Sequence, residues 1–169
     1  MRIVEAKPRP DAAVLPGADF VDAWRADGVA IGESAEAIAQ RLFSRKPRWV
    51  AWLLALRNLL VSPFSLKTKN PDPVSEDQGF AFPVISSRPD RVVLGMDDRH
   101  LDFRLVIDME ARGLDALAAV ATTYVRTHNL GGRLYMAVIR PFHRRVVPAM
   151  LKRAASAPDG AGAPGAYRV

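Results

Sequence analysis

Three histidines are the side chains of this 169-residue sequence best suited to proton transfer near neutral pH. They are His100, His128 and His143, and the local patterns place them on different predicted elements. No H-x-x-x-H or H-E-x-x-H spacing occurs and the chain holds no cysteine, so we expect no metal site. His143 is the leading candidate for chemistry. It is either a general base at the mouth of a pocket, or a histidine that lies on the surface of a helix or bonds to a carbonyl group.

Polar side chains inside apolar segments are the next candidates. Arg57 and Asn58 interrupt residues 47–61, which are otherwise nearly all apolar, and a buried polar pair is costly unless it is hydrogen-bonded. The pair therefore binds helix-end carbonyls or a carboxylate, or it lines a cavity and holds a polar group of a ligand. Tyr124 and Tyr135 are the remaining candidate ligand anchors.

The carboxylates give a weaker signal. Asp102, Asp108 and Glu110 alternate with apolar residues along 99–111, which predicts that they face solvent; the opposite register would turn them into a cavity. Asp22 is expected at an exposed position of a strand or turn, where aspartate is usually found. No nucleophile elbow, phosphate-binding loop or G-x-G-x-x-G motif is present, so no known catalytic motif assigns a reaction or a cofactor.

The elements that must position these residues change their period along the chain. Residues 18–26 predict a first strand, and residues 35–46 predict a helix with Ser34 as its N-cap. Residues 47–61 predict a second helix. After a proline-rich loop the period becomes two, and short turns join the apolar runs, which predicts an antiparallel meander. Its four strands are expected over residues 79–87, 91–98, 99–111 and 114–129.

Residues 130–153 predict a long, basic, amphipathic helix. An apolar row recurs every four residues, at Leu130, Leu134, Val138, Phe142, Val146 and Met150. Further apolar residues widen it, at Tyr135, Ile139, Val147 and Leu151. Pro141 and Pro148 predict kinks. A second interpretation makes 133–139 a fifth strand of the meander and begins a shorter helix at Pro141.

Composition sets the scale of the protein. The length suits one domain, 49% of the residues are apolar and the formal net charge is +6. We expect an extended arm over 1–17, a single domain over 18–154 and a disordered, Gly/Pro-rich tail over 155–169. No run of eighteen apolar residues occurs, the N-terminus does not resemble a secretory signal, and cysteine is absent. Together these features predict a cytoplasmic protein.

The order of strand, two short helices, meander and long C-terminal helix resembles the START-like, birch-pollen-allergen-type helix-grip fold. This α+β fold wraps a curved antiparallel sheet around the C-terminal helix. Three pieces also resemble a bacterial family of unknown function, conventionally numbered 2867. They are ADFVDAW at 18–24, PRWVAWLLALRNLLV at 47–61 and GRLYMAVIRPFHRRVVPAMLKR at 132–153. The resemblance covers about residues 15–155, and it implies a fold without implying catalytic residues.

We therefore expect a domain that binds a small hydrophobic or amphipathic molecule in a cavity between the sheet and the C-terminal helix, with no cofactor. A cyclase- or hydratase-type enzyme that uses the same cavity is an alternative. A non-catalytic interaction domain, for example a homodimer, is another. The basic helix also permits weak docking on an anionic membrane. We expect no nucleic-acid partner, because no recognition motif accompanies the basic residues.

Overall fold

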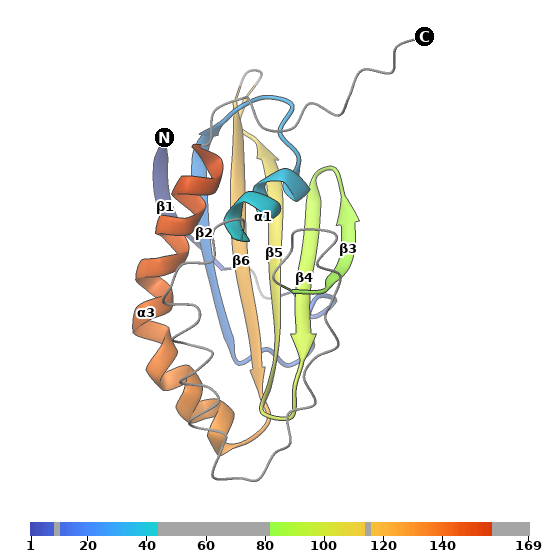
Figure 1. Cartoon of the computed structure of the whole chain (residues 1–169), viewed down its shortest axis with the longest axis vertical. Coiled ribbons are helices and arrows are strands. Elements are labelled where there is room, and N and C mark those ends of the chain that lie inside the picture. The colour runs from blue at the N-terminus through green and yellow to red at the C-terminus, as the bar shows by residue number, and fades with distance from the viewer. Residues whose placement is uncertain (9–10, 44–81, 114–115, 157–169) are drawn as a thin grey trace.

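The computed structural model describes residues 1–8, 11–43, 82–113 and 116–156, and these form an antiparallel sheet with helices on one face (Figure 1). The strands are β1 (Arg2–Ala6), β2 (Phe20–Val29), β3 (Val84–Arg88), β4 (Arg91–Asp97), β5 (Leu101–Ala111) and β6 (Leu117–Thr127). The helices are α1 (Ala35–Phe43) and α3 (Leu130–Ala155). The predicted helix over 47–61 lies outside the described residues.

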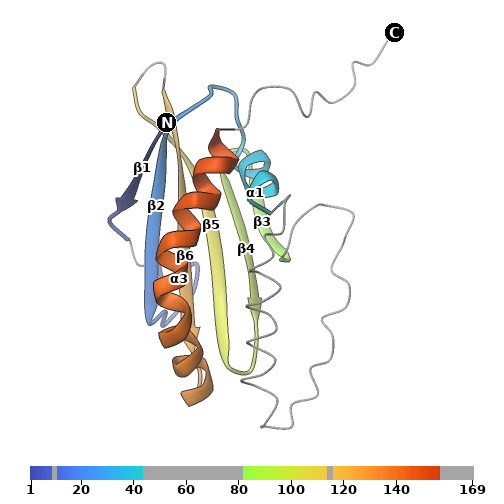
Figure 2. The ribbon, with the colours of Figure 1, turned by 60° about the vertical axis from the view of Figure 1, so that its left-hand side comes forward.

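The strand order β1-β2-β6-β5-β4-β3 confirms the predicted meander. Strands β3 to β6 follow one another across the sheet, and β2 returns to pair with β6. Residues 2–6 of the predicted arm form the edge strand β1, which pairs with β2 in the register Ala6↔Ala23. Figure 2 shows the curvature of the sheet around the helices. The described part is therefore an α+β structure with a curved antiparallel sheet.

The main core lies between the sheet and the two helices. Small side chains on two central strands, Ala26, Ala119 and Ala121, are fully buried, which allows the helices to approach the sheet closely. Ile38 of α1 and Leu151 of α3 fill this interface and are also fully buried. The opposite face carries a smaller cluster, formed by Leu15, Val93, Val106 and Tyr124.

Helix α1 confirms the predicted start at Ser34. The Ser34 Oγ atom accepts a hydrogen bond from the backbone N–H of Ala37 at 3.1 Å, which satisfies one of the free donors at the helix N-terminus. Glu36 lies in the first turn, where it complements the helix dipole. These local signals fix the point where the chain leaves the sheet and begins to cover it.

Helix α3 is one continuous helix from Leu130 to Ala155, so the alternative strand over 133–139 is wrong. The Asn129 side chain caps it by accepting a hydrogen bond from the N–H of Gly132 at 3.0 Å. Pro141 and Pro148 lie inside the helix. The helix runs along β1, β2 and β6 and reaches α1 near its C-terminal end (Figures 1 and 2).

The buried face of α3 differs from the predicted row. Leu130 is 79% exposed, Leu134 is 57% exposed and Phe142 is 44% exposed. Residues four apart advance by about 40° beyond a full turn, so a row with strict four-residue spacing winds around the helix. The buried positions do not keep a strict four-residue spacing, and they are Gly132, Met136, Ile139, Leu151, Ala154 and Ala155. No helix in the described ranges is long and apolar enough to cross a membrane.

Candidate functional site

Three polar side chains from three elements meet between α3 and the sheet. Asp22 on β2 and Thr123 on β6 are direct partners across the sheet, so both side chains face the helix. His143 of α3 lies above them. Its Nδ1 atom is 2.9 Å from Asp22 Oδ2, and its Nε2 atom is 3.5 Å from Thr123 Oγ1. We call these three residues the Asp22 cluster.

The Asp22 cluster is largely shielded from solvent. Asp22 is 6% exposed and Thr123 is 8% exposed, whereas the His143 side chain retains 20% of its surface. His143 is therefore the most exposed member of the cluster. The Phe20 ring meets the His143 ring edge-on at 6.0 Å between centroids, and the Arg140 guanidinium lies 4.7 Å from the Phe20 centroid.

The Asp22 carboxylate is only half satisfied. Its Oδ2 atom accepts hydrogen bonds from His143 Nδ1 and from Trp24 Nε1, the latter at 3.3 Å. Its Oδ1 atom is buried, and no donor within the described ranges reaches it. A buried acceptor without a partner costs about 1–3 kcal/mol, so a hydrogen-bond donor added at this oxygen would stabilise the protein.

The contacts of His143 set its proton positions. An ionised carboxylate can only accept hydrogen bonds, so Nδ1 is the donor toward Asp22. In the neutral ring Nε2 is then an acceptor, and it faces the Thr123 hydroxyl. The order carboxylate, imidazole and hydroxyl is the one that general-base catalysis uses, because the carboxylate orients the ring and Nε2 accepts the proton.

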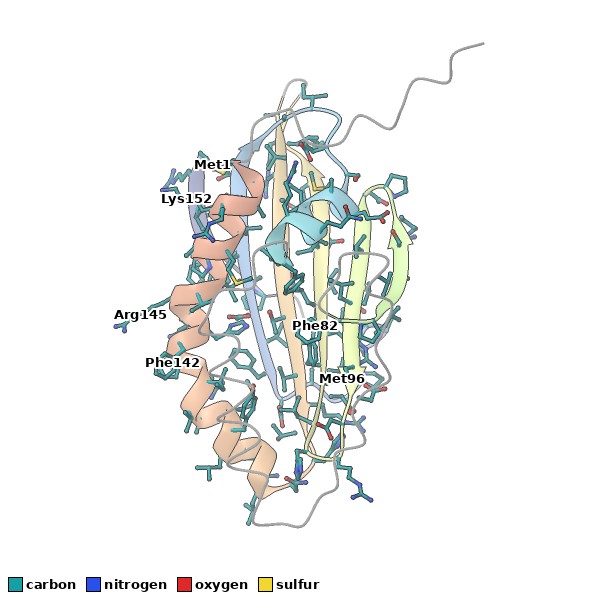
Figure 3. All side chains as sticks on the ribbon, in the orientation of Figure 1. Met1, Phe82, Met96, Phe142, Arg145 and Lys152 are labelled. Atoms are coloured by element: carbon teal, nitrogen blue, oxygen red, sulfur yellow. The ribbon has the colours of Figure 1, made fainter. Side chains whose placement is uncertain are left out.

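The same face of the sheet carries aromatic rings that are only partly buried. Phe82 meets Phe43 edge-on at 5.6 Å and Phe103 at 4.7 Å between centroids. Figure 3 places Phe82 over the sheet, on the side of the helices. Together with Phe20, which contacts His143, these rings make part of the helix-covered face aromatic.

The structure does not bring all predicted ligand anchors together. Tyr124 follows Thr123 on β6, and adjacent strand residues point to opposite faces, so Tyr124 lies in the cluster with Leu15 on the other side of the sheet. Burial, the main cause, raises the pKa of Tyr124, and the nearby Asp11 adds to the increase. Tyr135 is half-buried on α3, about 12 Å before His143 along the helix axis.

The predicted anchors Arg57 and Asn58 lie outside the described residues. Of the candidates that the structure describes, His143 alone belongs to the Asp22 cluster. The sequence had predicted an exposed Asp22, and this was wrong. The available signal was the alternation Phe20, Asp22, Trp24, which places an acid between two aromatic residues on one strand face. No local pattern singles out Thr123.

The other two histidines lie in separate clusters. His128 Nε2 is 2.9 Å from Asp102 Oδ1, and His100 Nδ1 lies within 3.2 Å of the Asn129 side chain. Asp102 points to the face opposite the helices, as the predicted alternation of 99–111 requires, but it is only 9% exposed. Within the described ranges no three His, Asp or Glu side chains are arranged to hold a metal ion.

The carboxylates of β5 and its neighbour β4 differ in their electrostatic surroundings. Burial raises the pKa of Asp108, although Arg91 opposes the effect from 3.5 Å. Arg104 donates a hydrogen bond from Nη1 to Asp97 Oδ1 at 2.6 Å, and this bond lowers the pKa of Asp97. Both pairs lie on the face away from the Asp22 cluster, so they bear on stability and pH dependence rather than on the candidate site.

Comparison with known proteins gives a family without a described activity. Curated proteins and solved structures, when searched, gave no match to this chain. The family model described as "Protein of unknown function (DUF2867)" matches residues 14–150, which include all three members of the Asp22 cluster. This match covers well over half of the sequence, and the chain therefore belongs to the DUF2867 family.

Proposed function

We propose that this chain is a START-like, helix-grip domain that binds a small amphipathic molecule on the helix-covered face of its sheet. The curved antiparallel sheet and the long C-terminal helix packed along it support the fold assignment. The cysteine-free composition is consistent with action in the cytoplasm of a bacterium. Ligand sites of this type are mostly apolar and carry a few polar groups that fix the orientation of the ligand.

The Oδ1 atom of Asp22 has no hydrogen-bond partner among the described residues, and this observation carries the proposal. A carboxylate is costly to bury, and Asp22 lies in an interface where Thr123 and His143 are its polar neighbours and most other buried side chains are apolar. A ligand with a hydroxyl, amide or amine group would supply the missing donor. The apolar part of the ligand would lie against the ring of Phe20 and the other aromatic rings on the helix-covered face. The expected ligand class is therefore a flat or elongated apolar molecule with one hydrogen-bond donor at its end.

A matched pair of fluorescent probes tests this proposal. Naphthol and methylnaphthalene have the same shape, and only naphthol carries a donor. We expect the wild-type protein to bind naphthol more tightly. We expect Asp22→Asn to weaken naphthol binding by roughly tenfold, because hydrogen bonds to charged groups contribute about 1.5–3 kcal/mol, and to leave methylnaphthalene binding unchanged.

Asp102→Asn is the matched control, because Asp102 is also a buried aspartate but lies on the opposite face of the sheet. This variant should bind both probes as the wild type does. Equal affinity for the two probes, or an equal loss in the control, would contradict the proposal. If the probes bind as expected, native mass spectrometry of protein purified from its own cells would identify a ligand that copurifies with it.

A second function is acid–base catalysis at the same site, and the contact between His143 Nδ1 and Asp22 Oδ2 at 2.9 Å favours it. A ring oriented in this way keeps Nε2 available to move a proton on a bound substrate. NMR of labelled imidazole nitrogens should show the Nδ1-protonated tautomer for neutral His143, and Asp22→Asn should reduce its population. A ring protonated mainly at Nε2 would remove this second candidate.

A further inference from the structure

The net positive charge of this chain equals the charge of one helix. α3 holds six basic residues, Arg133, Arg140, Arg144, Arg145, Lys152 and Arg153, and no acidic residue. The whole sequence has 24 basic and 18 acidic residues, a formal net charge of +6. Without the six cations of α3, the remaining 18 basic residues balance the 18 acidic ones. The net charge of the protein is therefore the charge of α3.

Most of these cations point into solvent. Arg133, Arg145, Lys152 and Arg153 are exposed, and Figure 3 shows Arg145 on the side of α3 that faces away from the sheet. Among the described residues, an acidic partner on another element lies near Arg144, which is 3.6 Å from Glu5 of β1, and both side chains are more than half exposed. The outer side of α3 therefore presents an extended positive surface.

The same outer side carries large apolar side chains. Leu130 is 79% exposed and Leu134 is 57% exposed, and their four-residue spacing makes them neighbours on the helix surface. Phe142 is a further exposed apolar residue of α3, and Figure 3 places it on the same side as Arg145. Three of the six exposed large hydrophobic residues in the described ranges thus lie on this one helix, among its cations.

We propose that the outer face of α3 docks on an anionic lipid bilayer, with the helix axis parallel to the surface. The exposed leucines enter the boundary between headgroups and acyl chains, and the arginines and lysine contact lipid phosphates and carboxylates. A nucleic acid would offer phosphates to the cations but no apolar region to the leucines, so the combination favours a bilayer. This docking does not depend on the ligand proposed for the Asp22 cluster.

Vesicle co-sedimentation of the full chain tests this docking. We expect binding to mixed phosphatidylcholine–phosphatidylserine vesicles and little binding to phosphatidylcholine alone, and we expect added salt to weaken the binding. The double variant Arg145→Gln/Arg153→Gln should reduce vesicle affinity by roughly 25-fold, because each cation near an anionic surface contributes about a fivefold factor. Leu134→Gln should reduce it by roughly fivefold through lost apolar contact.

Matched controls carry the same chemical changes elsewhere on the surface. Arg88→Gln/Arg112→Gln removes two exposed cations away from α3, and Ile85→Gln replaces an exposed apolar residue on the edge strand β3. Both controls should bind vesicles within about twofold of the wild type. All of these positions are exposed, so circular dichroism should show an intact fold in each variant.

Several results would overturn the proposal. These are equal binding to both vesicle types, no binding to either, or equal losses in the control variants. Tighter binding to a DNA duplex than to the mixed vesicles, at matched phosphate concentration, would assign the basic face to nucleic acid instead. A homodimer that light scattering detects and that does not bind the mixed vesicles would also overturn the proposal, because α3 would then serve a contact between two copies of the chain.

Discussion

The contact between His143 and Asp22 should contribute measurably to stability. We predict that His143→Ala destabilises the fold by about 2–3 kcal/mol, because it removes a hydrogen bond to a buried carboxylate and the edge-on packing against Phe20. Asp22→Ala should cost about 1–2 kcal/mol, a smaller amount because it also removes the unsatisfied Oδ1 atom. The double variant should be less destabilised than the sum of the two.

The expected coupling follows from the burial of the pair. Exposed ion pairs contribute about 0.2–1 kcal/mol, and breaking a fully buried pair costs about 3–5 kcal/mol. Asp22 is nearly buried, but the His143 side chain keeps 20% of its surface, so water can partly replace the ring. We therefore expect a coupling energy of about 1–2 kcal/mol, below the range for removing one partner of a buried pair.

The assay is a double-mutant cycle measured by urea unfolding, in which unchanged slopes confirm that all variants unfold in the same way. The pair Asp102 and His128 provides the control cycle, since its atoms are also 2.9 Å apart. His128 is more exposed, and Arg126 lies 3.7 Å from Asp102 as a further partner, so the coupling between Asp102 and His128 should stay below about 1 kcal/mol. Additive effects at Asp22 and His143, or equal coupling in both cycles, would refute this reasoning.

Three further predictions concern the start of α3 and the partly buried carboxylate of Asp108 on β5. Gly132→Ala should destabilise the protein by about 1–3 kcal/mol in thermal unfolding. The added Cβ would lie 2.1 Å from the backbone oxygen of His100, so the two segments must separate. An unchanged melting temperature would contradict this contact. Asn129→Ala should cost about 0.5–2 kcal/mol and increase amide exchange in the first turn of α3, whereas Asn129→Asp should retain most of the cap. Burial raises the pKa of Asp108 in the folded state, so ionisation of this carboxyl group opposes folding. The wild-type protein should therefore lose stability as pH increases through the raised pKa. Asp108→Asn cannot ionise at this position, so its stability relative to the wild type should rise over the same pH range. A fall in relative stability over the same pH range would mean that the pairing with Arg91 outweighs burial.

Local signals in the sequence determined much of the architecture. Alternation along β5 correctly assigned Leu105 and Ile107 to the core face, because the period of a strand is fixed by its backbone geometry. Ser34 marked the start of α1 through a hydrogen bond that forms within four residues. The meander followed from short turns between such strands. These features need no knowledge of distant contacts, and for that reason they could be read before the structure was known.

The face that α3 buries was decided by tertiary structure. Apolar residues occur around much of this helix, so its sequence offers more than one apolar row, and only the sheet selects the row through Met136 and Ile139. The leucines that the strict four-residue row had assigned to the core instead face outward among the arginines. Composition had identified a basic helix, but the direction of its exposed side could not be derived from composition.

The candidate site also required the three-dimensional structure. Asp22, Thr123 and His143 are separated by up to 121 positions in the sequence, and they meet only because β2 pairs with β6 in one register and α3 crosses both strands. A shift of one residue in that register would exchange Thr123 for Tyr124 on the helix-covered face. The sequence determined the chemical character of each side chain, whereas strand register and helix placement determined which of them can act together.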